Sequence, residues 1–269
     1  MYFQHRSVLL DGCVENLNIK KDGIYIDGTL GAAGHSKSIA EKLGSDGLLI
    51  GIDQDINAIK AASKNLQGSL CQLELVHDNF RNLEEILNSL EIDAIDGLLL
   101  DLGVSSHQLD EAGRGFSYMH DAELDMRMDT RNLLTAKQVV NDYPKQELER
   151  IFWQYGEEKW GKRVAEFIVE YRRTQEIRTT YELVDIIKKA IPKAVRRVGG
   201  HPAKKIFQAI RIEVNQELEI IENTIRIATN YMNPGGRICV ITFHSLEDRI
   251  VKNTFRNLNN PCTCPPQFP

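Results

Sequence analysis

The sequence predicts an α/β fold: a Rossmann-like parallel sheet interrupted by an inserted all-helical domain. Two observations predict the sheet. Short apolar runs rich in Ile, Leu and Val recur along the first hundred residues, and helix-like stretches separate them. A third observation predicts the insert, because the alternation stops and roughly 135 residues, 102–236, pass before the next convincing strand. A parallel crossover needs only about a dozen residues, so the excess indicates a separate helical domain.

The expected strands are almost wholly apolar, as strands buried on both faces are. They cover residues 24–26, 48–52, 73–76, 97–100 and 237–242. Helical apolar spacing is found over residues 36–43, 56–66 and 83–90, and in the insert over 144–155, 157–173, 181–191 and 203–232. We therefore expect one domain from residues 1–107 and 208–269, with its C-terminal strands missing, and an inserted helical domain from residues 108–207.

Composition excludes several classes of protein. Hydrophobic residues make up 42% of the 269 and charged residues 26%, which excludes wholesale disorder. No apolar run approaches the roughly 18 residues of a membrane span, and residues 1–17 lack the apolar core of a signal peptide. Five scattered cysteines fit a reducing cytoplasm. Cys262 and Cys264 form a single C-x-C, which lacks the second half of a zinc site, so we expect no metal.

The net charge of −5 hides an asymmetry. Residues 159–211 hold fourteen Lys or Arg and five Asp or Glu, whereas the remainder holds nineteen basic and thirty-three acidic residues. A basic block on an acidic protein is typical of phosphate-backbone binding, although solvated helix faces have the same composition. If the block binds phosphates, the cations that would grip them are Arg172, Arg173, Lys188, Lys189, Arg196, Arg197, Lys204 and Lys205.

A small-residue turn follows the first expected strand, from Gly28 to His35. Such a turn lets the backbone approach a ligand closely, and the following helix presents free N–H groups. The dinucleotide fingerprint is absent because Leu30 stands where that register needs glycine, and no P-loop motif is present. The turn is either a ligand site or purely structural.

Asp53 ends the second strand, nineteen residues after Gly34. An acid at this position accepts hydrogen bonds from ribose hydroxyls. Asp53 could instead cap the next helix, but Asp55 is better placed for that. A ribose-binding acid beside a turn without the pyrophosphate fingerprint fits S-adenosylmethionine, which has an adenosine half and no phosphate.

Acids end each of the first four strands, at Asp27, Asp53, Asp78 and Asp101. In open α/β sheets ligands bind at this carboxyl edge. Phe80, close to Asp78, either flanks an adenine ring or belongs to the core.

Several segments resemble the RsmH (MraW) family of bacterial S-adenosylmethionine-dependent methyltransferases, over essentially the whole chain. They are residues 27–36 (DGTLGAAGHS), 99–108 (LLDLGVSSHQ), 114–117 (RGFS), 124–129 (LDMRMD) and 242–249 (TFHSLEDR). The resemblance implies methylation of the N4 amine of a cytidine in the decoding region of 16S ribosomal RNA. It also implies that the cofactor contacts are Ala33, Gly34, His35, Asp53, Phe80, Asp101 and Gln108.

The chain departs from the family pattern at several points. Ala32 stands where the family usually has a second glycine, which is tolerable if φ there is negative. Residues 121–123 read Asp-Ala-Glu where Gly-Pro is expected. Family members also run on past the Cys262–Cys264 stretch to further strand-forming sequence, so we expect the final strands of a seven-stranded sheet to be missing.

The catalytic residue is not identified by the sequence, and two side chains are candidates. Asp101 could accept a hydrogen bond from the cytosine amine or serve only the cofactor. His244, which follows the last strand, could take the leaving proton or hydrogen-bond structurally. The candidates for a ring that stacks on the base are Phe116, Tyr118 and Phe243, each of which could be a core residue.

Three hypotheses remain from the sequence. The first is the rRNA cytidine-N4 methyltransferase with 16S rRNA as its partner, with a homodimer left open and, as an alternative, a methyltransferase of the same fold that acts on another nucleic acid. The second is a nicotinamide-dependent oxidoreductase, against which Leu30 argues. The third is a non-catalytic RNA-binding module, against which the retained strand-end acids argue.

Overall fold

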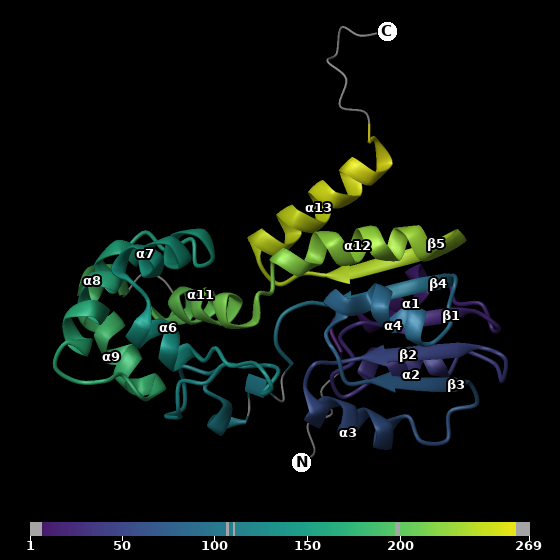
Figure 1. The fold of residues 1–269 in the computed structure, drawn as a ribbon, viewed down its shortest axis with the longest axis horizontal. Helices are drawn as coiled ribbons and strands as arrows, with labels where there is room; N and C mark the ends of the chain where they lie inside the picture. Colours follow the sequence, from purple (N-terminus) through teal and green to yellow (C-terminus); the bar gives the residue numbers. More distant parts are fainter. Residues whose placement is uncertain (1–6, 106–107, 110, 197–199, 262–269) are drawn as a thin grey trace, which may run out of the picture. The chain divides into compact units, whose positions relative to one another are not determined.

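The computed structural model describes residues 7–105, 108–109, 111–196 and 200–261 (Figure 1). The chain divides into two compact units, one formed by residues 1–103 and 218–269 and the other by residues 104–217. The first is called here the sheet unit and the second the helical unit.

The sheet unit contains five parallel strands in the order β3-β2-β1-β4-β5 (Figure 1). They are β1 (Ile24–Asp27), β2 (Leu48–Ile52), β3 (Gln72–Val76), β4 (Ile95–Asp101) and β5 (Met232–Ile241). In register, Ile24 pairs with Leu48 and Asp101 with Ile241. The predicted α/β fold with a parallel sheet is confirmed.

Helices cover both faces of this sheet. One face packs on α1 (Leu10–Asn16), α2 (Gly34–Ala40) and α3 (Ile56–Asn65), and the other on α4 (Leu83–Ser89), α12 (Glu219–Tyr231) and α13 (Ser245–Asn259). Successive side chains of a strand point to opposite faces. Leu99 of β4 therefore joins the first cluster, while Leu98 and Leu100 join the second. All three are fully buried, which explains the continuous apolar runs.

The helical unit is built from α6 (Ala136–Asp142), α7 (Lys145–Gln154), α8 (Gly161–Arg172), α9 (Thr180–Ala190), α10 (Lys193–Arg196) and α11 (Lys204–Asn215), with a short 3-10 helix at Ala112–Arg114. Its core is separate from those of the sheet unit and includes Phe152, Ile187 and Ile210, none of which is exposed. Among the described residues of this unit no named strand occurs, in agreement with the helical pattern of the sequence.

One expected helix, 203–232, is wrong, because two helices occupy that range. The chain turns at Gln216, whose left-handed φ of 53° ends α11, and α12 begins at Glu219. The two helices belong to different units. The limit expected between residues 207 and 208 falls inside α11, whereas the compact units divide after Glu217. Glutamine carries no turn signal of the kind that glycine or proline provides. The apolar spacing therefore continues from α11 into α12 and does not show where α11 ends.

The segment before α6 is fastened to α11 by a buried amide. Asn215 Oδ1 accepts a 2.8 Å hydrogen bond from the Met128 N–H, and Asn215 Nδ2 donates to the Met126 carbonyl at 2.8 Å. Met126 has a left-handed φ of 59°. Asn215 is 3% exposed, so its amide supplies the partners that this irregular backbone needs away from water.

Candidate active site

The strand order reverses between β1 and β4. The chain runs outward from β1 to β2 and β3, then crosses back to β4 on the other side of β1. A ligand crevice in an open α/β sheet lies at such a point, outside the carboxyl ends of the strands. Two hydrogen bonds tie these ends together: Gly28 N–H donates to the Leu99 carbonyl at 2.9 Å, and Asp101 N–H donates to Thr29 Oγ1 at 2.6 Å. Parallel pairing brings the predicted acids to this one edge.

Asp27 shapes the first turn from within. Its carboxylate accepts hydrogen bonds from Ser36 Oγ at 2.7 Å and from Thr29 N–H at 3.2 Å, and the residue is 1% exposed. Burial raises the pKa of Asp27, against the lowering effect of these bonds. A carboxylate enclosed in this way orders the backbone between β1 and α2.

The turn itself contains two left-handed residues, Gly31 with φ of 51° and Ala33 with φ of 65°. Ala32, which lies between them, is not among the positive-φ residues, so its Cβ is tolerated as expected. At Gly34 a Cβ would collide with Ser7 Oγ. Leu30 is 3% exposed and packs in the core, which explains an apolar side chain in place of a fingerprint glycine.

Asp53 lies at the tip of β2 and faces this turn. Its Oδ2 accepts from Gly31 N–H and its Oδ1 from Asp55 N–H, each at 2.8 Å. Burial raises the pKa of Asp53 to about 6. Asp55 caps α3 by accepting from Asn57 N–H at 2.9 Å. The prediction that Asp55 rather than Asp53 caps this helix is therefore confirmed. Each Asp53 oxygen keeps a further lone pair for a ligand hydroxyl.

His35 stands in the first turn of α2 and is 5% exposed. Its Nε2 lies 3.0 Å from the Val8 carbonyl oxygen, which requires that Nε2 carry the proton. Its Nδ1 lies 3.8 Å from Asp101 Oδ2, too far for a hydrogen bond. His35 therefore connects the N-terminal segment to the carboxyl edge of the sheet.

Asp78 and Phe80 follow β3. Asp78 Oδ1 accepts from Asn79 N–H at 2.7 Å and from Asn82 Nδ2 at 2.9 Å, while Asn79 caps the short helix Phe80–Asn82 by accepting from Arg81 N–H. Phe80 is 9% exposed and lies in the apolar cluster beneath α12. Its packing satisfies the core interpretation, and an adenine contact stays a prediction.

His244 caps α13. Its Nδ1 accepts from Glu247 N–H at 3.4 Å, and its Nε2 lies 3.1 Å from Glu247 Oε1. Glu247 in turn accepts from Phe243 N–H at 2.7 Å and from His244 N–H at 3.3 Å, and it is 1% exposed. Sequence reasoning missed Glu247, although an acid three residues after an N-cap is the mark of a capping box. The imidazole thus caps the helix through Nδ1, whereas its buried Nε2 has no hydrogen-bond partner among the described residues.

The three candidate stacking rings differ in exposure. Phe116 is 6% exposed. The ring of Tyr118 stacks on His201 with centroids 4.4 Å apart. Phe243 is 55% exposed and lies directly after β5, where a Cβ added to Gly103 would come within 3.5 Å of it. Of the three, Phe243 has a ring face available at the carboxyl edge of the sheet.

Gln108 belongs to the helical unit rather than to the sheet unit. It is 7% exposed, its Oε1 accepts from Ser105 N–H at 3.1 Å, and its own N–H donates to Ser105 Oγ at 3.2 Å. These bonds close the turn after β4. The carbonyl oxygen of the side chain is therefore already used locally.

No helix in the described ranges is long and apolar enough to cross a membrane. Within the same residues, no three His, Cys, Asp or Glu side chains gather as a metal site requires. Cys262 and Cys264 lie outside the described residues.

The edge residues suit S-adenosylmethionine chemically. The Asp53 carboxylate is an acceptor of the kind that ribose hydroxyls need, and left-handed Gly31 leaves the turn backbone open to close approach. At the switch point Asp101, whose side chain is 25% exposed, carries the charge opposite to that of a sulfonium cation, whereas Asp27 is 1% exposed. A doubly wound parallel sheet with such an edge and an inserted helical unit defines a nucleoside-binding α/β enzyme.

Comparison with known proteins specifies the family. The model of the MraW methylase family matches residues 2–269, and the chain belongs to this family. It is 59% identical to the ribosomal RNA small subunit methyltransferase H of Clostridioides difficile (strain 630), over 100% of this chain and 86% of that protein. The proteins of the same name from Acetivibrio thermocellus and Ruminiclostridium cellulolyticum are 58% and 56% identical, over 100% of this chain and 87% of each. S-Adenosylmethionine is the methyl donor that goes with this membership.

Solved structures are more distant. NSun6 from Pyrococcus horikoshii matches with a TM-score of 0.42 and 16% identity, over 91% of this chain and 39% of that one. An rRNA methylase from Streptococcus thermophilus matches with a TM-score of 0.29 and 17% identity, over 46% and 72% of the two chains. The fold assignment therefore rests on the sheet itself.

Proposed function

We propose that this chain transfers the methyl group of S-adenosylmethionine to the exocyclic N4 amine of a cytidine in 16S ribosomal RNA. The observation that carries the proposal is identity of 55–59% across the whole chain to proteins named ribosomal RNA small subunit methyltransferase H. The cytidine and its N4 atom come from the family resemblance of the motifs. Action on ribosomal RNA puts the enzyme in the cytoplasm, and assembly into a homodimer stays a prediction.

The cofactor contacts proposed for the sheet unit come from the family motifs, and its geometry supports Asp53 in particular. Asp53 accepts hydrogen bonds from the ribose hydroxyls, since its carboxylate is already oriented by two backbone N–H groups. Ala33, Gly34 and His35 provide the turn and the first helical turn against which the cofactor lies. Phe80 contributes an apolar edge. Gln108 is assigned to the cofactor only by its motif.

The chemistry needs a positioned amine more than a strong base, because the lone pair of the cytosine amine is delocalised into the ring. Asp101, with its side chain 25% exposed at the switch point, is placed to accept a hydrogen bond from the N–H groups and align the nitrogen. His244 is proposed as a positioning residue, since its imidazole caps α13 and holds the Phe243–His244 backbone through Glu247. Phe243 then offers its exposed ring as the stacking surface for the base.

The test is methyl transfer from methyl-deuterated S-adenosylmethionine to small ribosomal subunits from a strain that lacks this methylation. After digestion of the RNA, mass spectrometry should find label on N4-methylcytidine. Label on another nucleoside would overturn the assignment of the N4 atom, and RNA without label would overturn the proposed activity. The Asp53→Asn variant, with its ribose acceptor weakened, serves as the low-activity control.

A further inference from the structure

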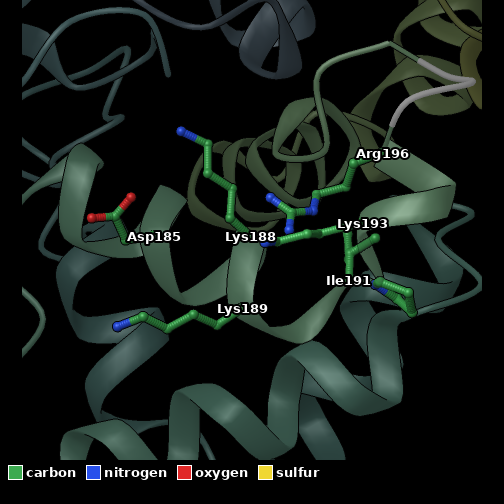
Figure 2. A pocket seen from close by; sticks show the side chains of 7 residues that line it. Asp185, Lys188, Lys189, Ile191, Lys193 and Arg196 are labelled. Carbon is green, nitrogen blue, oxygen red and sulfur yellow. The ribbon is translucent and has the colours of Figure 1, made fainter.

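A cluster of cations gathers where α9 meets α10. Pro192 cannot continue α9, and its preceding residue Ile191 is extended, so α10 begins at once and folds back beside the end of α9. The turn lines an open pocket of about 500 Å³. Figure 2 shows the side chains that line it, which are Asp185, Lys188, Lys189, Ile191, Pro192, Lys193 and Arg196. The four cations among them are called here the α9–α10 cluster.

The charge of this cluster is not balanced within the described part of the chain. None of its four cations forms an ion pair there, and the buried Arg196 Nε has no hydrogen-bond partner. Asp185 is the one carboxylate among the lining residues. The carboxyl end of α9 adds about half a negative charge. An excess of more than two positive charges remains, and an unpaired buried guanidinium donor is costly unless an anion meets it.

Three other cations of the basic block already contact protein groups. Arg172 donates to the Val140 and Tyr143 carbonyls at 2.8 and 2.6 Å, and so supports the fold. Arg173 pairs with Glu170, and Lys205 Nζ donates to the Glu157 carbonyl at 2.9 Å. These three are among the cations expected to grip RNA, and contacts within the protein already use at least one donor of each. Arg197 lies outside the described residues.

We propose that the α9–α10 cluster is a docking site for the phosphodiester backbone of the substrate RNA, remote in sequence from every residue of the cofactor edge. This inference rests on the proposed function, because that function supplies a polyanionic substrate. Phosphate is the anion that matches a guanidinium fork surrounded by ammonium groups. The proposed function favours RNA over an anionic membrane as the source of this phosphate, and the vesicle measurement below separates the two.

The test compares two triple variants of the full chain with equal loss of charge. In the first, Lys188→Gln, Lys189→Gln and Lys193→Gln remove the accessible ammonium groups of the cluster. In the control, Lys137→Gln, Lys145→Gln and Arg178→Gln remove half-buried or exposed cations of the same unit that pair with Glu176 or Glu166. Filter binding to a 16S rRNA transcript is measured between about 50 and 200 mM salt.

Loss of three phosphate contacts should lower the slope of log affinity against log salt by about 2 to 3. The control should change it by less than about 1. Equal slopes for the two triple variants would overturn the proposal, as would loss of binding to phosphatidylserine vesicles with unchanged RNA binding. Thermal midpoints monitor folding, and if the triple variant unfolds, each single substitution should lower the slope by about 1. The proposed function is tested separately by methyl transfer, so either can fail alone.

Discussion

The carboxyl edge of the sheet and the α9–α10 cluster hold charge in opposite ways. At the edge, Asp27 is buried and Asp53 is half-buried, and each accepts two hydrogen bonds that fix the carboxylate. In the cluster, Lys189 and Lys193 are exposed and have no carboxylate partner within the described residues. Folding therefore orients the carboxylates at the edge, whereas it leaves the Lys189 and Lys193 ammonium groups without an ion-pair partner in the described part of the chain.

This difference matches the two ligands of a methyltransferase that acts on RNA. A small cofactor is bound by few contacts, so each acceptor must be held in place before binding. A polymer is bound by many phosphate contacts of low individual precision, for which flexible ammonium groups suffice. The charge count of the basic block therefore overestimates its RNA-binding surface, because contacts within the folded protein engage part of that charge.

The largest expected effect comes from Asn215→Ala, which tests whether the two units are independent. The substitution removes the hydrogen bonds of the Asn215 amide to the buried Met128 N–H and to the Met126 carbonyl, which should cost about 3 kcal/mol of stability in the helical unit. Hydrogen exchange should accelerate in α6 and α11, while affinity for S-adenosylhomocysteine stays unchanged. The exposed Asn223→Ala in α12 is the control. Parallel loss of cofactor binding would show that the units do not act separately.

Asp53→Asn should weaken cofactor binding at the carboxyl edge of the sheet. An amide cannot accept from both Gly31 N–H and Asp55 N–H and also supply charge-assisted bonds to the ribose. Calorimetric affinity for S-adenosylhomocysteine should fall about 10- to 100-fold. Asp55→Asn is the matched control, because asparagine caps a helix as well as aspartate does. Equal affinities of the two variants would contradict the role of Asp53.

Phe243→Leu should lower activity on the RNA substrate without changing cofactor binding. Leucine keeps an apolar side chain but loses the ring face, and base stacking on an aromatic ring contributes about 1–3 kcal/mol. We expect kcat/KM for the small subunit to fall about tenfold or more, with cofactor affinity unchanged. Trp153→Leu, at a ring that is 67% exposed on α7, is the control. An equal loss in both variants would remove the special role of Phe243.

The smallest effect expected is the pH dependence of cofactor binding. Burial raises the pKa of Asp53 to about 6, so the free protein carries a proton there at pH 5. Because the ionised form is the stronger acceptor, affinity for S-adenosylhomocysteine should rise about tenfold from pH 5 to pH 7. The folded state holds this proton more tightly than the unfolded state, so the same group lowers the free energy of unfolding as pH rises from about 4 to about 6. Titration calorimetry should find a flat profile in Asp53→Asn, and a slope there would point to another group.

Local patterns predicted most elements because their physical causes are local. The apolar strands of β1, β2 and β4 are visible since both of their faces are buried. The Asp55 cap followed from its place before an apolar helix. The division between α11 and α12 was not visible, because a left-handed glutamine carries no compositional mark. The helix α13 and the role of Glu247 were missed because histidine is an unusual N-cap residue.

The sequence by itself determined the sheet, the helical insert, the cofactor class and the family, since these depend on periodicity and on short motifs contiguous in the chain. Which charged side chains are held by other protein groups is seen only in the tertiary structure. Arg172 and Lys188 are alike in sequence, yet one supports the fold and the other faces a pocket. The partners of a long side chain come from segments distant in the sequence, such as Val140 for Arg172. Hydrogen-bond partnership is therefore a property of packing, which the residue type alone does not fix.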